Sequence, residues 1–233
     1  MKPVVPDPWA ALRARTPARL ALGRAGAGLP TRPLLELGLA HARARDAVHH
    51  PLEVDRLCAD LAAAGFVPQV VRSAAQDRGT YLARPDLGRR LRAGEKLEGE
   101  AEIVVAIEDG LSALAVQAHA VPLLRCLPER WKEARVVVAL QGRVALGDEI
   151  GERMKARLVA VLIGERPGLS SPDSLGIYLT WAPKVGRTDA ERNCISNVRP
   201  QGLGYAEAAR KLDWLAAAAL ARGQSGVALK DYS

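Results

Sequence analysis

The sequence is poor in aromatic residues and in cysteine, and it lacks any long apolar run. Phe, Tyr and Trp make up 4% of its 233 residues, which predicts a core of Leu, Val and Ala and leaves no base-stacking platform. Its three cysteines are far apart and form no C-x-x-C motif, so neither a disulfide framework nor a zinc site is indicated. No stretch of about 18 apolar residues occurs, which argues against a membrane span. We therefore expect a cytoplasmic protein that does not enter a membrane.

Basic residues outnumber acidic ones. There are 33 Lys and Arg against 26 Asp and Glu, a formal net charge of +7. The basic residues form no recognition helix and no tract with interleaved aromatics, so we do not expect a nucleic-acid partner. A solvated basic surface or a patch that faces an acidic partner subunit explains the excess equally well. A basic scaffold or nucleic-acid-binding protein remains an alternative, and a steep loss of DNA affinity with added salt would be needed to support it.

The first 65 residues predict helices. Thr31 is a candidate N-cap of a helix that ends near Val48. The apolar positions on one side of this helix are Leu34, Leu35, Gly38, Leu39 and Ala42. A second helix is predicted over residues 53–64, where Gly65 ends it. We assign residues 1–65 to a smaller helical N-terminal part.

Beyond residue 65 the pattern changes to β-branched runs that alternate with amphipathic segments. The predicted strands are residues 66–72, 80–83, 101–107, 135–140, 157–163 and 175–181, and the predicted helices are residues 84–92, 111–127, 148–156 and 205–222. The strongest runs lack clean alternation, as expected of parallel strands covered on both faces. Strands that alternate with helices form right-handed βαβ units. We expect an α/β fold in residues 66–233, a Rossmann-like, mostly parallel sheet with flanking helices.

Three glycine-containing loops follow the predicted strands, at residues 109–110, 142–144 and 164–168. In an open α/β sheet, ligands bind beyond the carboxyl ends of the strands, so we expect these loops to converge on one crevice. Two of their acidic residues have simpler interpretations. Asp109 is interpreted as a helix N-cap beside Ser112, and Glu165 can pair with its neighbour or with a nearby helix.

No catalytic constellation is evident. Cys194 has no His in its own segment, and nothing nearby lowers the pKa of its thiol. The chain has no G-x-S-x-G motif, and its four His lie outside residues 140–200. A stand-alone nucleotide-binding Rossmann enzyme is the alternative, but its phosphate-binding glycine fingerprint is missing. The pattern favours a subunit that holds a cofactor for chemistry done elsewhere.

Five segments resemble the small (light) subunit of ethanolamine ammonia-lyase. They are RPDLGRRL (84–91), DGLSALAV (109–116), GRVALGDEIGE (142–152), VLIGERPGLSSPDSLGIYLT (161–180) and TDAERNCISN (188–197). The likeness extends from about Trp9 to the end of the chain, and GERPGL and RNCISN are its most specific motifs.

The resemblance implies an adenosylcobalamin-dependent lyase that converts ethanolamine to acetaldehyde and ammonia. In that family the large subunit is a TIM barrel that holds the substrate and the radical chemistry. The small subunit has a Rossmann-like domain that covers the cobalamin at the subunit interface. The resemblance further implies a heterododecamer of six large and six small chains, in which this chain is a non-catalytic small subunit.

Family cobalamin contacts correspond here to Val144, Glu165 and Cys194, all on loops predicted to follow strands. A carboxylate at Glu165 can accept N–H groups from the amide side chains of the corrin, and the main chain around Val144 offers further donors and acceptors. Cys194 would give a small, polarizable packing surface. No catalytic residue and no protein ligand to a metal is assigned in this chain.

The D-x-H-x-x-G pattern of base-off cobalamin binding is absent, since Asp109 is followed by Gly110 and Leu111. This departure fits the family's base-on binding mode. Some members carry a longer N-terminal extension that targets a bacterial microcompartment. Because this chain begins close to the shared core, the sequence favours the cytoplasm over encapsulation.

Overall fold

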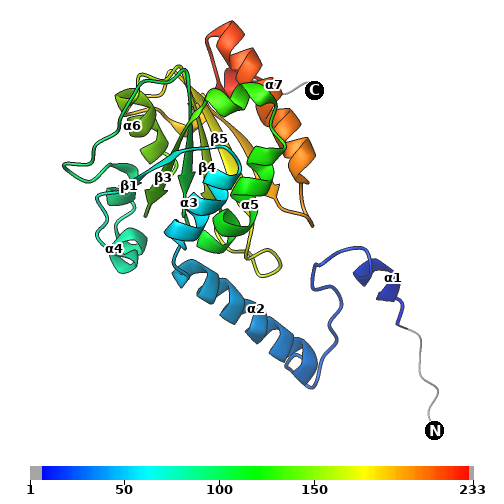
Figure 1. The fold of residues 1–233 in the computed structure, drawn as a ribbon. Coiled ribbons are helices and arrows are strands. Elements are labelled where there is room, and N and C mark those ends of the chain that lie inside the picture. Colours follow the sequence, from blue (N-terminus) through cyan, green and yellow to red (C-terminus); the bar gives the residue numbers. More distant parts are fainter. Residues whose placement is uncertain (1–6, 231–233) are drawn as a thin grey trace.

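The computed structural model describes residues 7–230 and arranges them around one six-stranded sheet (Figure 1). The strands are β1 (Pro68–Arg72), β2 (Ile103–Glu108), β3 (Arg135–Leu140), β4 (Leu158–Gly164), β5 (Leu175–Trp181) and β6 (Arg192–Val198), in the spatial order β1-β3-β2-β4-β5-β6. The predicted α/β class is confirmed. The first four strands pair in parallel, whereas β5 and β6 are antiparallel to their neighbours. The prediction of a mostly parallel sheet therefore holds for β1 to β4 only.

Helices cover both faces of this sheet (Figure 1). The helices of residues 7–230 are α1 (Ala10–Arg13), α2 (Thr31–His49), α3 (Val54–Ala63), α4 (Arg78–Ala83), α5 (Ala113–Arg125), α6 (Leu146–Arg153) and α7 (Tyr205–Arg222), of which α1 and α2 lie away from the sheet. Short 3-10 turns add η1 (Leu87–Arg89), η2 (Glu129–Glu133), η3 (Asp189–Glu191) and η4 (Gly226–Ala228). One apolar core joins α3, α5 and α7 to the sheet, and a second core lies under α6 on the other face. No helix in residues 7–230 is long and apolar enough to cross a membrane.

The central strands are apolar on both faces because each of them contributes side chains to both cores. In β2, Val105 and Ile107 belong to the core under α5, while Val104 and Ala106 belong to the core under α6. Successive side chains of a strand point to opposite faces, so a strand covered on both sides reads as a continuous apolar run. The crossovers through α5 and α6 run over opposite faces of the sheet. The loops after β2 and β3 therefore begin side by side at the carboxyl edge and turn toward opposite faces.

Local capping overrides two of the predictions for residues 80–92. Residues 80–83, predicted as a strand, belong to α4, because the Asp77 carboxylate accepts a hydrogen bond from the Thr80 N–H at 2.8 Å and starts a helical turn. The helix predicted over residues 84–92 reduces to η1. Asp86 does not cap it and accepts instead from the Arg84 guanidinium at 2.7 Å.

Two further cap predictions are wrong. Helix α2 begins at Thr31 as predicted, but its N-cap position is Pro30 and no side chain caps it. Ser112, not Asp109, is the N-cap of α5, where its hydroxyl accepts from the Ala115 N–H at 3.3 Å. The predictions for β3, β5 and α7 match the observed bounds. The division into residues 1–65 and 66–233 stays a prediction, and residues 1–6 and 231–233 of it lie outside the described part of the chain.

Candidate functional site

The three glycine-containing loops meet at the carboxyl edge of the sheet, as the sequence predicts. The loop after β2 is joined to the end of β4 by a hydrogen bond from the Leu111 N–H to the Gly164 carbonyl, at 2.9 Å. The three loops surround a cavity of about 430 Å³. Its lining residues are Tyr81, Leu111, Arg143, Val144, Ile163, Gly164, Glu165, Arg166 and Tyr178. Val144 and Glu165, two of the three predicted contact residues, thus share one cavity.

The turn that carries Val144 is fixed from two sides. On one side the Tyr81 hydroxyl donates to the Gly142 carbonyl at 3.0 Å, and the Arg143 guanidinium lies 4.2 Å from the centroid of the Tyr81 ring. On the other side the Asp109 carboxylate accepts from the Gly142 N–H at 3.1 Å. Tyr81 is fully buried, and the sequence interpretation missed it because it placed this residue in a strand. These contacts hold the turn in place before any ligand binds.

Glu165 lies at the rim of the cavity and is bound by donors from β6 and from the loop before β5. Its carboxylate accepts from the hydroxyls of Ser174 and Ser196, the latter at 2.6 Å, and from the Asn197 N–H at 3.2 Å. Neither of the two partners considered from the sequence, the neighbouring Arg166 and a nearby helix, supplies these donors. An ionised carboxylate has about four lone-pair sites, so three internal donors leave it able to accept from a ligand.

Cys194 lies in β6 and not on a loop, so that part of the prediction is wrong. It pairs across the ladder with Tyr178, a lining residue of the cavity. Burial raises the pKa of the Cys194 thiol, and the nearby charge of Glu165 raises it further, while a hydrogen bond with Tyr178 opposes them. The thiol therefore stays protonated at neutral pH, and a thiol is a poor nucleophile. Cys194 adjoins the cavity through Tyr178 and is not itself among the residues that line it.

A buried carboxyl group lies behind the site. Glu108 ends β2 with no exposed surface, and neither of its side-chain oxygens has a hydrogen-bond partner among the described residues. Burial raises the pKa of Glu108 well above its ordinary value, and the charges of Asp109 and Asp148 add to the effect. A Cβ at Gly142 would lie 2.7 Å from a Glu108 oxygen, so only glycine fits this turn beside the carboxyl group. The signal available in the sequence was a Glu that ends an otherwise apolar strand.

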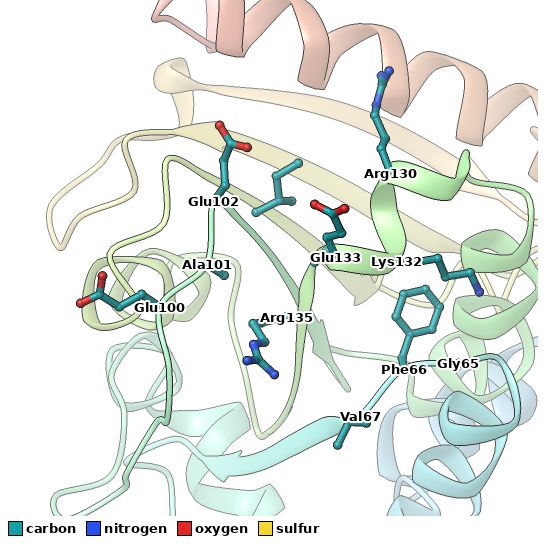
Figure 2. A pocket seen from close by; sticks show the side chains of 12 residues that line it. Gly65, Phe66, Val67, Glu100, Ala101, Glu102, Arg130, Lys132, Glu133 and Arg135 are labelled. Carbon is teal, nitrogen blue, oxygen red and sulfur yellow. The ribbon is translucent and has the colours of Figure 1, made fainter.

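A second cavity of about 420 Å³ lies at the opposite, amino edge of β2 and β3 (Figure 2). Figure 2 shows side chains of both charge signs around it: Glu100, Glu102, Arg130, Lys132, Glu133 and Arg135. It contains none of the predicted contact residues, and it is far from the glycine-containing loops. Residues 7–230 contain no group of three or more His, Cys, Asp or Glu side chains that could hold a metal ion.

The fold and the cavity together define an α/β protein with a cavity at the carboxyl edge of its sheet. The lining of the cavity, as far as residues 7–230 show it, has backbone, apolar and charged groups but no His, Ser or Cys that could form a nucleophile–base pair. Comparison with known proteins specifies this class further. The model of the family described as "Ethanolamine ammonia-lyase light chain (EutC)" matches residues 6–230.

Relatives agree along almost the whole chain. It is 56% identical to the ethanolamine ammonia-lyase small subunit of Azotobacter vinelandii, over 98% of this chain and 90% of that protein. Identity to the small subunit of Ralstonia nicotianae is 55%, again over 98% of this chain and 90% of the relative. It is 56% to that of Xanthomonas campestris pv. campestris, over 97% and 88%. The chain belongs to the family of ethanolamine ammonia-lyase light chains.

Proposed function

We propose that this chain is the non-catalytic small subunit of an adenosylcobalamin-dependent ethanolamine ammonia-lyase, and that it covers the cobalamin at the interface with a larger catalytic subunit. The observation that carries the proposal is the cavity at the carboxyl edge of the sheet, where Val144 and Glu165 meet in a chain of this family. Cys194 belongs to the same proposed contact surface through its neighbour Tyr178.

The chemistry of the cavity fits a corrin. The corrin ring is fringed with amide side chains, which donate and accept hydrogen bonds, while its face is apolar. Glu165 and the main chain at Gly164 supply the polar partners, and Val144, Leu111 and Ile163 supply an apolar surface. Cavities of this size take a drug-sized ligand, and cobalamin is several times larger. The size therefore favours a chain that contacts part of the cofactor and leaves the rest to a partner.

Within this proposal the chain binds and orients the cofactor. Adenosylcobalamin, when bound, supplies the radical chemistry of the lyase. The Val144 turn, fixed by Tyr81 and Asp109, presents a rigid surface, and Glu165 accepts hydrogen bonds from the corrin amides. No residue of this chain is assigned a proton-transfer role. Base-on binding, which the missing D-x-H-x-x-G pattern favours, is part of the proposal.

The partner in this proposal is the large subunit, in line with the name "small subunit" that the relatives carry. The TIM-barrel fold of that partner and the assembly of six large and six small chains are carried over from the family resemblance. Location in the cytoplasm, or in a bacterial microcompartment, is a further proposal on the same ground.

Reconstitution tests the proposed function. The isolated chain, incubated with adenosylcobalamin and ethanolamine, is expected to release no ammonia. Addition of a purified large subunit is expected to give turnover and to change the absorption spectrum of the bound corrinoid. Ammonia release by the isolated chain, or a large subunit with full activity and cofactor affinity on its own, would contradict the proposal. Binding of NAD in place of cobalamin would favour the nucleotide-binding alternative.

A further inference from the structure

Helix α2 leaves the body of the protein with an apolar face uncovered. It extends away from the sheet, and α1 lies beyond its far end (Figure 1). We define residues 7–49 as the N-terminal arm. Of the 19 residues of α2, only Ala40 and Ala47 are buried. Leu34, Leu35 and Leu39 are 54%, 67% and 51% exposed.

These leucines lie opposite the side that contacts the body. At 3.6 residues per turn, Ala40 and Ala47 share one side of α2, the side that packs toward α5. Leu34, Leu35 and Leu39 fall on the other side, together with Gly38. They form the apolar stripe visible in the sequence, and the described chain leaves it without a partner. A helix that is apolar on two sides is typical of one buried between two bodies.

Gly38 points to the same conclusion. A glycine inside a helix costs about 1 kcal/mol relative to alanine, and nothing in the described chain requires it, since a Cβ at Gly38 would meet no atom within 4 Å. A residue without a side chain in the middle of a leucine face lets another backbone approach closely. Trp9 and Leu12 of the arm are also half exposed, so the uncovered apolar surface continues beyond α2.

The charge of the arm indicates what covers it. The arm has seven Arg but only Asp7, Glu36 and Asp46 as acidic residues, a net +4 out of the formal +7 of the whole chain. On the helical projection Arg43 lies beside the leucine face, and Arg45 lies on the same side of α2 as Gly38, two turns further along. Two copies of the arm would repel each other, so a second copy of this chain is a poor occupant. An apolar groove with acidic residues at its rim is complementary in both respects.

The base of the arm lies at the edge of the sheet that holds the candidate cavity. The Arg78 guanidinium donates to the Val48 carbonyl at the end of α2, at 2.7 Å, and to the Gly110 carbonyl after β2, at 2.8 Å. Gly110 precedes Leu111, which lines the cavity. A partner that covers the cavity is therefore adjacent to the base of the arm at Val48.

We infer that the N-terminal arm docks, through Leu34, Leu35 and Leu39, into an acidic-rimmed apolar groove on the same larger subunit that completes the cofactor site. The inference rests on the proposed function. It adds a second contact region to the interface, on the arm and separate from the cavity.

The test compares binding of the purified large subunit to three forms of this chain. In the arm variant, Leu35→Glu and Leu39→Glu place two charges in the leucine face, and the dissociation constant is expected to rise at least about 100-fold. Thermal unfolding of the isolated variant is expected to match the wild type, because both leucines are exposed there. The matched control is Val67→Glu, at an 82% exposed apolar residue of the body, and it is expected to bind like the wild type.

Each outcome decides a separate question. A wild-type chain that does not bind the large subunit refutes the proposed function. A wild-type chain that binds, with an arm variant of equal affinity, refutes only the inference about the arm. Sedimentation of the isolated chain is expected to show a monomer, and a dimer abolished in the arm variant would overturn the inference in favour of a second copy.

Gly38→Gln gives an independent check. Glutamine is a good helix former, so the substitution is expected to raise the unfolding temperature of the isolated chain. Its side chain would also hinder close approach of a partner backbone, and the dissociation constant for the large subunit is expected to rise about tenfold or more. A variant that is more stable and binds with unchanged affinity would show that this face is not in contact with the partner.

Discussion

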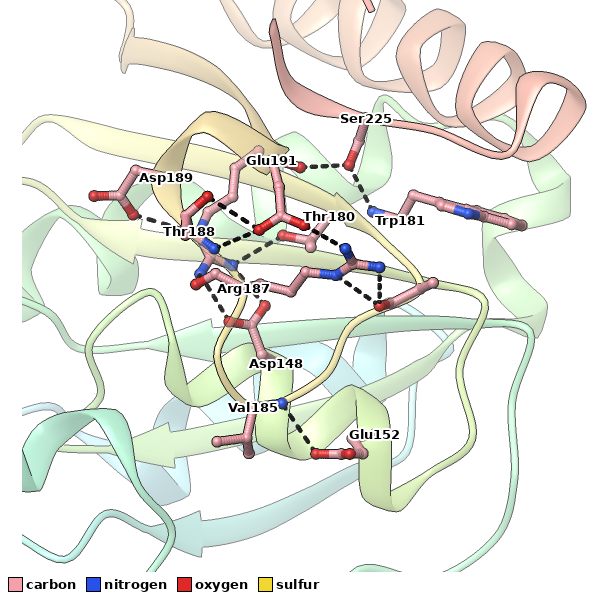
Figure 3. A network of polar contacts seen from close by, with 12 residues as sticks. Asp148, Glu152, Thr180, Trp181, Val185, Arg187, Thr188, Asp189, Glu191 and Ser225 are labelled. Atoms are coloured by element: carbon pink, nitrogen blue, oxygen red, sulfur yellow. Dashed lines mark hydrogen bonds and ion pairs between the residues drawn. The ribbon is translucent and has the colours of Figure 1, made fainter. Parts of the chain in front are cut away.

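Arg192 donates two hydrogen bonds to Asp148, from Nη1 to Oδ1 at 2.5 Å and from Nη2 to Oδ2 at 2.8 Å, and both side chains are almost completely buried. Figure 3 shows Asp148 in this polar network, with Thr180 and Arg187 beside it. Arg192 lies two residues before Cys194 in β6, and Asp148 lies four residues after Val144 in α6. The pair therefore connects the two parts of the proposed cofactor surface. Arg192 also donates to Thr180 of β5 and to the Arg187 carbonyl, and its Nε donates to Asp189, so each of its N–H groups has a partner.

Removal of one partner of this pair is expected to be costly. Arg192→Met leaves Asp148 as a buried carboxylate without its counter-ion, and the free energy of unfolding should fall by about 3–5 kcal/mol in urea titrations. The double variant Asp148→Leu with Arg192→Met removes both charges and should recover most of that loss. A single variant that costs less than about 1 kcal/mol, the value of an exposed pair, would show that the burial of this pair has no energetic consequence.

Glu165→Gln tests the proposed hydrogen bonds to the corrin amides. The substitution keeps the shape but removes charge-assisted bonds of about 1.5–3 kcal/mol, so the affinity for adenosylcobalamin in the reconstituted complex should fall about ten- to a hundredfold. Ser196→Ala, which removes one internal donor to Glu165, is the matched control and should change affinity less. Unchanged affinity in the Gln variant would assign Glu165 to the internal hydrogen bonds with Ser174, Ser196 and Asn197 alone.

Two substitutions of Cys194 separate a packing role from a nucleophilic one. Because burial raises the pKa of its thiol, Cys194→Ser should keep turnover at saturating cofactor, with a modest rise in the apparent dissociation constant of cobalamin. Cys194→Trp should weaken cobalamin binding more, since it would crowd the cofactor surface. Steady-state kinetics of both variants with the large subunit decide the matter. Abolished turnover in the Ser variant at saturating cofactor would favour the nucleophile.

Glu108 predicts a pH dependence of stability. Burial, with the charges of Asp109 and Asp148, raises the pKa of Glu108 in the folded chain above its ordinary value of 4.5. Between those two values the folded chain keeps a proton that the unfolded chain releases, so the free energy of unfolding falls as pH rises, by up to about 1.4 kcal/mol per pH unit. Glu108→Gln removes this contribution to the pH dependence of the free energy of unfolding.

The corresponding measurement is a set of urea titrations between about pH 5 and about pH 8. The Gln variant should gain stability relative to the wild type as pH rises. The exposed Glu98→Gln serves as the control and should run parallel to the wild type. Parallel curves for the Glu108 variant as well would mean that Glu108 is ionised in the folded protein.

Much of the fold follows from patterns within single segments. The Val-rich runs of β3 and β4 and the amphipathic pattern of α7 are local signals, because burial on one or both sides of an element repeats with the period of that element. The alternation of strands and helices then brings the loops with Val144 and Glu165 to the same edge of the sheet. The motifs GERPGL and RNCISN indicated the family, which the comparisons show.

What the tertiary structure decided depends on partners that are distant in the sequence. Glu165 binds Ser196 from 31 positions away, and Arg192 binds Asp148 from 44 positions away, so neither contact leaves a periodic trace. Cys194 is in a strand because β5 supplies the ladder, although its own segment is mostly polar. The leucine stripe of α2 was readable from the sequence as one side of a helix. Only the packing of the chain decided that this side faces outward, because the other side of α2 carries the small residues that fit against the body.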